Sequence, residues 1–209
     1  GTVAFDDVEI WTGPCEASLI DCDFEVNSCG WENDDKYPLT WSRVIAEEGS
    51  ESMGYDHTTN TQRGHYMFPQ LADSLHTEGY GLLVGPYLTA GGGEQCLRFW
   101  YNIEGLSTIG LLAIGEEGNE NELWSHAGNR INGWTLGRVD VNVNRTMKLA
   151  FKAEYPEEFG NSVVLDDISL VPDHCPSNIL SCDFDESLCG WSNVFMSTLP
   201  WLVGQGFTI

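Results

Sequence analysis

The sequence predicts an all-β fold: a two-sheet, antiparallel, jelly-roll-like β-sandwich that is stapled by disulfide bonds. Short segments that alternate hydrophobic and polar residues predict the strands, and Gly- and Asn-rich breaks between them predict the turns. Cysteines recur in a set that can pair completely, which predicts the disulfides. No segment of similar length combines helical spacing with capping residues, so we expect no crossover helices of the kind an α/β fold needs.

Three segments show the alternation most clearly: residues 96–103, 138–143 and 146–155. Their hydrophobic faces consist of Leu97, Phe99, Tyr101 and Ile103, of Val139, Val141 and Val143, and of Met147, Leu149, Phe151, Ala153 and Tyr155. A period of two is typical of antiparallel strands that have one face on the core and the other in water. Breaks at 91–93, 115–121, 132–133 and 156–161 supply glycine and asparagine, which tolerate the backbone angles of tight turns.

The start and the end of the chain contain the same pattern. Residues 22–25 read Cys-Asp-Phe-Glu and residues 182–185 read Cys-Asp-Phe-Asp, and Cys-Gly-Trp occurs at both 29–31 and 189–191. The second copy follows the first by about 160 residues, the size of one globular domain. We therefore expect a tandem array. Residues 1–15 would end one domain, residues 16–175 would form a complete domain, and residues 176–209 would begin the next.

The seven cysteines are odd in number, but the repeat explains the extra one. Cys15 holds the position in the preceding domain that Cys175 holds in the complete domain, so its partner belongs to that preceding domain and the other six can pair. The complete domain contains Cys22, Cys29, Cys96 and Cys175. Four cysteines allow three connectivities. The last partial repeat retains only Cys182 and Cys189, the copies of the first two, so we expect these to pair with each other. The same logic pairs Cys22 with Cys29 and leaves Cys96 for Cys175. Disulfides indicate an oxidising compartment.

The composition is strongly acidic, with a net charge of −23 from 9 Lys and Arg against 32 Asp and Glu. Such a surface repels nucleic-acid phosphates and anionic membranes and attracts cations. We therefore expect no nucleic-acid partner. We also expect no membrane insertion by this segment, because no hydrophobic run approaches the roughly 18 residues that a span needs. A simpler interpretation is that the acidity only keeps a secreted protein soluble.

The doublet Asp166-Asp167 interrupts a hydrophobic segment. Alternation places Asp166 on the face of Val164, Ile168 and Leu170, pointing inward. A carboxylate in that position must accept N–H bonds, meet a cationic side chain or bind a metal ion.

We expect one structural Ca²⁺, since calcium prefers six to eight oxygen ligands. Its candidate ligands are Asp23, Glu25, Asp56, Asp166 and Asp167. The alternative is a buried Asp that is satisfied by the backbone and by Arg98 or His57.

Catalytic motifs are missing from the sequence, including nucleophile elbows, phosphate-binding glycine loops and His-Glu-x-x-His. We therefore expect neither enzymatic activity nor an organic cofactor. Five tryptophans, Trp31, Trp41, Trp100, Trp124 and Trp134, are expected in the core, although a sugar-binding groove is the alternative. Asn144-Arg145-Thr146 matches an N-glycosylation acceptor, whereas Asn27-Ser28-Cys29 is the rare cysteine form, which we expect its disulfide to block.

Together these residues resemble the MAM domain, the extracellular module named after meprin, the A5 antigen (neuropilin) and receptor tyrosine phosphatase mu. The opening of that family is similar to residues 22–25, 29–31 and Trp41, its centre to residues 96–101 and its close to residues 165–168. The resemblance covers residues 16–175 and both partial repeats. It implies a jelly-roll sandwich, no catalysis, and a cation near the opening and closing strands.

The resemblance implies a non-catalytic adhesion or scaffolding module, located outside the cell or on its surface. Its partners would be other proteins or neighbouring repeats, including homophilic contacts. The alternatives are a carbohydrate-binding jelly roll, or an accessory region of a larger receptor or protease.

Overall fold

The computed structural model describes residues 18–47, 53–71, 79–128, 133–156 and 162–176. These residues contain ten strands in two antiparallel sheets, and none of them is helical. The predicted two-sheet sandwich is therefore confirmed. The described residues lie within one compact unit, Glu16–Cys175, followed by Pro176. The partial repeats expected at 1–15 and 176–209 otherwise lie outside the described residues, so the tandem organisation stays a prediction.

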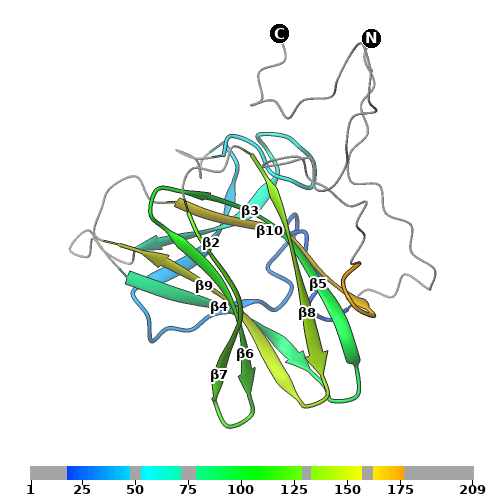
Figure 1. The fold of residues 1–209 in the computed structure, drawn as a ribbon. Helices are drawn as coiled ribbons and strands as arrows, with labels where there is room; N and C mark the ends of the chain where they lie inside the picture. The colour runs from blue at the N-terminus through cyan, green and yellow to red at the C-terminus, as the bar shows by residue number, and fades with distance from the viewer. Residues whose placement is uncertain (1–17, 48–52, 72–78, 129–132, 157–161, 177–209) are drawn as a thin grey trace, which may run out of the picture. The chain divides into compact units, whose positions relative to one another are not determined.

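Each sheet has five strands (Figure 1). The first sheet follows the order β1 (Glu32–Asn33), β4 (Gly79–Leu88), β9 (Met147–Tyr155), β6 (Thr108–Gly115) and β7 (Glu120–Ala127). The second sheet follows the order β2 (Leu39–Ile45), β3 (His65–Leu71), β10 (Ser162–Pro172), β5 (Gly93–Glu104) and β8 (Thr135–Val143). Consecutive strands repeatedly lie in opposite sheets, which is the connectivity expected of a jelly roll.

The core lies between the two sheets and is built by the alternating faces that the sequence predicts. Leu97, Phe99, Tyr101 and Ile103 of β5 are all at most 4% exposed. Facing them, β9 contributes Phe151, whose ring lies 4.8 Å from that of Phe99 between centroids. Edge-to-face packing of this kind adds to the free energy of burying the rings.

Two tryptophans of the opening segment complete this core. Trp31 and Trp41 are each 2% exposed, as expected. The indole N–H of Trp31 donates to the carbonyl of Ile20 at 2.9 Å, and that of Trp41 donates to Gly81 at 3.3 Å. A buried indole needs such a partner because its N–H would otherwise lose its bond to water.

Two disulfides staple the domain. Cys22 is bonded to Cys29 and Cys96 is bonded to Cys175, with sequence separations of 7 and 79 residues. The second bond fastens the end of the domain to β5. Cys182 and Cys189, which we also expect to pair, lie outside the described residues.

Candidate functional site

The closing strand β10 contains a bulge that determines which way its acidic residues face. Its pairing with β5 shifts register between Asp166 and Ser169, and Asp167 has φ of 46°. Leu165 and Ile168 consequently both face the core, whereas Asp166 faces the opposite side of the second sheet. The expectation that Asp166 shares a face with Ile168 is therefore wrong. The reason is the extra residue of the bulge, which breaks the period of two.

Asp166 is nevertheless completely buried, with 0% of its surface exposed. Its Oδ2 accepts the backbone N–H of His57 at 2.9 Å, and its Oδ1 accepts the N–H of Asp167 at 2.8 Å. Burial is the main cause that raises the pKa of Asp166 to about 8, and the neighbouring charge of Asp167 raises it further. This carboxyl group therefore holds a proton at neutral pH when no cation compensates its charge.

His57 links this strand to the loop that precedes β3. Its imidazole Nδ1 bonds to Asp167 Oδ2, and its ring stacks on Trp100 with 3.8 Å between centroids. The neighbouring hydroxyl of Thr58 donates to Asp167 Oδ1 at 2.7 Å. Both oxygens of Asp167 thus have partners, and the loop is fixed to the face of the second sheet.

Asp56 organises the same loop from within. It is 0% exposed, and it accepts the backbone N–H groups of Thr59 at 2.5 Å and Thr61 at 2.9 Å, and the Thr59 hydroxyl at 2.8 Å. Burial opposes ionisation of this carboxyl, but these hydrogen bonds outweigh burial and lower its pKa. Asp56 is therefore a structural anion whose oxygens are already occupied.

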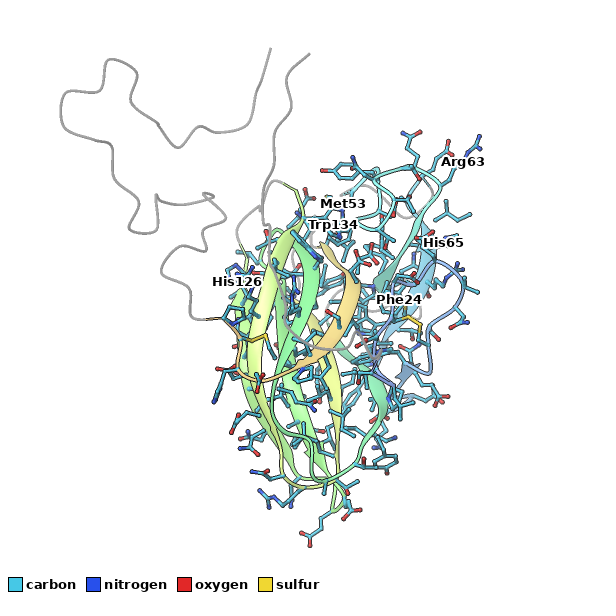
Figure 2. The ribbon with its side chains drawn as sticks, turned by 90° about the vertical axis from the view of Figure 1, so that its right-hand side faces the viewer. Phe24, Met53, Arg63, His65, His126 and Trp134 are labelled. Carbon is cyan, nitrogen blue, oxygen red and sulfur yellow. A yellow bond between two sulfur atoms is a disulfide. The ribbon has the colours of Figure 1, made fainter. Side chains whose placement is uncertain are left out.

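The opening segment, residues 22–25, does not form a regular strand. Cys22 makes only an isolated bridge with Ile168, and Phe24 adopts a left-handed conformation with φ of 56°. Phe24 is buried, whereas the side chain of Glu25 turns toward β3 and accepts the N–H of His65 at 2.7 Å. Figure 2 labels Phe24 and His65 at this side of the domain. Arg43 fixes the segment by donating to the carbonyl of Glu25 at 2.6 Å.

The five candidate calcium ligands therefore come from three neighbouring segments but do not all converge. Asp166 and Asp167 share one loop partner, His57. The other three candidates, Asp23, Glu25 and Asp56, each accept backbone N–H groups of their own. Within the described part of the chain, no group of three or more His, Cys, Asp and Glu side chains is arranged to hold a metal ion. The oxygen chemistry and the buried negative charge suit Ca²⁺, but the observed grouping does not provide a set of ligands. The calcium site stays a prediction.

A second feature was not foreseen from the sequence. On the outer face of the first sheet lies an open groove of about 930 Å³. It is lined by Tyr87, Lys148, Ile114, Asn33, Asp34 and Glu116, among others. The Tyr87 side chain is 54% exposed, and Lys148 Nζ lies 4.4 Å from its ring centroid. Its signal in the sequence is Gly85-Pro86, which lies within the bulge between Val84 and Tyr87 that sets the direction of the ring.

The tryptophans do not build a sugar-binding surface in this groove. Trp124 packs against the main core, Trp134 packs beside Met53, and Trp100 is covered by His57. Figure 2 shows Met53 and Trp134 close together near one end of the domain. The groove contains tyrosine instead, so any aromatic contact with a ligand there depends on Tyr87.

The fold and these sites define a disulfide-bonded jelly-roll module. Residues 22–176 match the family described as MAM domain, meprin/A5/mu, and the chain belongs to this family. MAM domains are typically extracellular adhesion modules, and the similar MAM domains are non-catalytic. Among the described residues, no helix has the length and apolar character needed to cross a membrane.

Two similar proteins extend over nearly the whole chain. Thyroid hormone-induced protein B of Xenopus laevis is 28% identical over 230 residues, covering 99% of this chain and 33% of its own length. Human MAM domain-containing protein 2 is 28% identical over 234 residues, with the same coverage. Neuropilin-1 of Xenopus laevis is 27% identical over 182 residues, covering 81% of this chain and 18% of its own length. The chain thus spans about a third of the first two relatives.

Solved structures share the fold at low identity. The K2 cleaved adhesin domain of Lys-gingipain has a TM-score of 0.54 at 14% identity, covering 72% of this chain and 98% of that domain. The CBM22 and GH10 modules of a Clostridium thermocellum xylanase, complexed with xylohexaose, have a TM-score of 0.51 at 15% identity, covering 76% of this chain and 29% of that chain. These likenesses show the sandwich architecture.

Proposed function

We propose that this chain is a section of a tandem MAM array that acts outside the cell as an adhesion or scaffolding module. The observation that carries this proposal is the repeated opening motif at residues 22–31 and 182–191, in a chain whose relatives align over 99% of its length. The stapled sandwich supports such a role. It provides a rigid body whose surface loops can contact other proteins or neighbouring repeats.

The charge of the module determines how it can associate. A net charge of −23 means that two copies repel each other at low ionic strength. Homophilic contact therefore needs screening by salt, and at about 0.15 M the Debye length has fallen to roughly 8 Å. A heterophilic partner would instead need a basic surface, and its association would weaken as salt is added.

The experiment uses the full chain in two arms. Sedimentation equilibrium at low and high ionic strength measures self-association, and binding of fluorescent chain to cells before and after trypsin treatment measures association with surface proteins. We expect self-association that rises with salt, or trypsin-sensitive binding that falls with salt. A chain that stays monomeric at every ionic strength and binds no cell type would reject adhesion by protein contact.

A second candidate function, binding of a neutral oligosaccharide, is favoured by the groove at Tyr87. An exposed tyrosine ring can stack on the C–H face of a sugar, and nearby Asn33, Asp34 and Glu116 can bond to its hydroxyls. The xylanase module of similar fold was solved with xylohexaose, which suggests a class of probe for this chain.

Calorimetric titration with xylohexaose and with chitotetraose tests this candidate. Tyr87→Ala should weaken binding at least tenfold, whereas Tyr55→Ala should leave it unchanged. Tyr55 is the matched control because it is also exposed but lies outside the groove. Heat changes that are absent for both sugars, or that persist in Tyr87→Ala, would reject the groove as a sugar site.

A further inference from the structure

The connection between β8 and β9 lies at one end of the sandwich, where three turns meet. Val143, the last residue of β8, pairs with Gly93, which follows the turn from β4 to β5. Met147, the first residue of β9, pairs with Leu88 and with Gly115 at the start of the β6–β7 turn. Figure 1 shows these connections together at the lower end of the ribbon. The β8–β9 turn also crosses from the second sheet to the first, so it stands between the two layers.

Asn144 occupies this turn in an accessible position. Both Asn144 and Arg145 are exposed, and Thr146 is half-buried. The backbone N–H of Asn144 donates to Asn142 Oδ1 at 3.2 Å, which holds the turn. The side-chain amide of Asn144 makes no hydrogen bond to the described residues, so it is available to an enzyme that reads Asn-x-Thr in an extended or turn segment.

We propose that Asn144 carries an N-linked glycan. The donor is an oligosaccharide linked through pyrophosphate to a lipid carrier. The Nδ2 atom of Asn144 forms a bond to the anomeric carbon of the first sugar, the bond from that carbon to the phosphate oxygen breaks, and the lipid pyrophosphate leaves. Nδ2 gives up one proton to a base, and no atom is oxidised or reduced. The hydroxyl of Thr146 completes the recognition sequence.

Asn27 offers a matched comparison within the same domain. It precedes Ser28-Cys29, yet its Oδ1 already accepts the Cys29 N–H at 2.7 Å, and the Cys29 thiol is consumed in the bond to Cys22. Once that disulfide has formed, Cys29, the third residue of the motif, no longer has a free thiol for the glycosylating enzyme to recognise. We therefore expect Asn144 to be modified and Asn27 to remain free.

The modification has a consequence for the way the module meets its partners. A glycan on Asn144 covers the end of the sandwich formed by the three turns. It also lies near the groove, because Lys148 of β9 pairs directly with Tyr87. Protein partners would then be confined to other surfaces, such as the loop that Asp56 and His57 organise. This consequence rests on the extracellular location proposed above.

The test is made on the full chain, secreted from mammalian cells behind a heterologous leader. This design separates the two proposals, because glycosylation is then measured whatever the native location. We expect wild-type chain to lose mass on treatment with peptide N-glycosidase, and tryptic peptides to show conversion of Asn144 to Asp. Thr146→Ala and Asn144→Gln should abolish the shift, whereas Thr146→Ser should retain it.

Asn27→Gln serves as the control, since it should leave the mass shift of the glycan unchanged. Non-reducing peptide maps that show both disulfides confirm that each secreted variant has folded. Wild-type chain that is secreted with both disulfides but without a glycan at Asn144 would overturn the inference. A glycan found at Asn27 instead of Asn144 would overturn it as well.

Discussion

The carboxylate of Asp56 fills the space beside the α-carbon of Gly64. A Cβ at residue 64 would lie 2.0 Å from Asp56 Cγ and 2.2 Å from Oδ1. The carboxylate cannot move aside cheaply, because Thr59 and Thr61 hold it by hydrogen bonds. The loop therefore packs against the start of β3 through the buried carboxylate of Asp56, which needs a glycine at position 64.

This relationship predicts that Gly64→Ala is destabilising. Overpacking against a fixed group should lower the free energy of unfolding by about 1–3 kcal/mol. Gly54→Ala is the matched control, because a Cβ there meets nothing within 4 Å, and its effect should stay within about 0.5 kcal/mol. Urea unfolding of both variants measures the difference, and equal stabilities would contradict the close fit of Asp56 against Gly64.

The buried proton on Asp166 predicts an unusual pH dependence. Its folded pKa of about 8 lies above the ordinary value of 3.8, so between these limits the folded state binds the proton that the unfolded state has released. The free energy of unfolding should therefore fall as pH rises from about 4 to about 8, by at most about 1.4 kcal/mol per pH unit from this group. Thermal unfolding in chelator across this range measures the slope.

Two variants identify the group responsible. Asp166→Asn should flatten the slope, since the amide does not titrate, whereas the exposed Asp173→Asn should leave it unchanged. Asp56 acts in the opposite direction because its pKa is lowered: its contribution is present above its unfolded value and is lost as the pH falls below it. A slope that persists in Asp166→Asn would assign the effect to other groups.

Calcium binding is predicted to stabilise the domain. If Asp166 and Asp167 contribute ligands, Ca²⁺ should raise the midpoint of thermal unfolding, and more strongly at pH 8 than at pH 5, because protons compete for Asp166. Asp167→Asn should remove the response, and Asp173→Asn should keep it. A wild-type midpoint that responds to neither calcium nor chelator would end the calcium hypothesis.

The two disulfides should differ in their contribution to stability. The loop closed by Cys96 and Cys175 has a sequence separation of 79, against 7 for Cys22 and Cys29. In the chain-entropy view, replacing Cys96 and Cys175 by serine should lower the free energy of unfolding by about 4.5 kcal/mol, and replacing Cys22 and Cys29 should lower it by about 2.5 kcal/mol. Chemical unfolding of the two double variants compares them, and a larger loss from the short loop would contradict an entropic origin.

The strands could be predicted from the sequence because their faces alternate without interruption. The buried faces of β5, β8 and β9 are the hydrophobic ones that a period of two selects, apart from the half-buried Met147. The repeat logic likewise indicates the partners of Cys22 and Cys96 that the structure shows. The alternation can be read within each strand, and the cysteine pairing can be read from the repeated motif, so neither prediction needs the three-dimensional fold.

The candidate sites were harder to predict because they depend on departures from regular structure. The bulge after Asp166 reverses the faces that follow it, and Phe24 adopts a left-handed conformation that is rare for a bulky residue. The exposure of Tyr87 depends on a second bulge. The first two departures have no glycine or proline that would reveal them, whereas Gly85 and Pro86 lie within the bulge before Tyr87 and mark it in the sequence.

The bond between Cys96 and Cys175 also affects how the module would respond to mechanical load. Because Cys175 closes the domain and Cys96 lies near its middle, traction on the two ends cannot lengthen the 79-residue stretch between the sulfur atoms. A domain pulled open by force would release only the backbone before Cys96, apart from the short loop that Cys22 and Cys29 close, at roughly 3.5 Å for each residue freed. A tandem array of such domains would therefore lengthen by a small increment each time one domain unfolds, because nearly half of each domain stays closed by the disulfide.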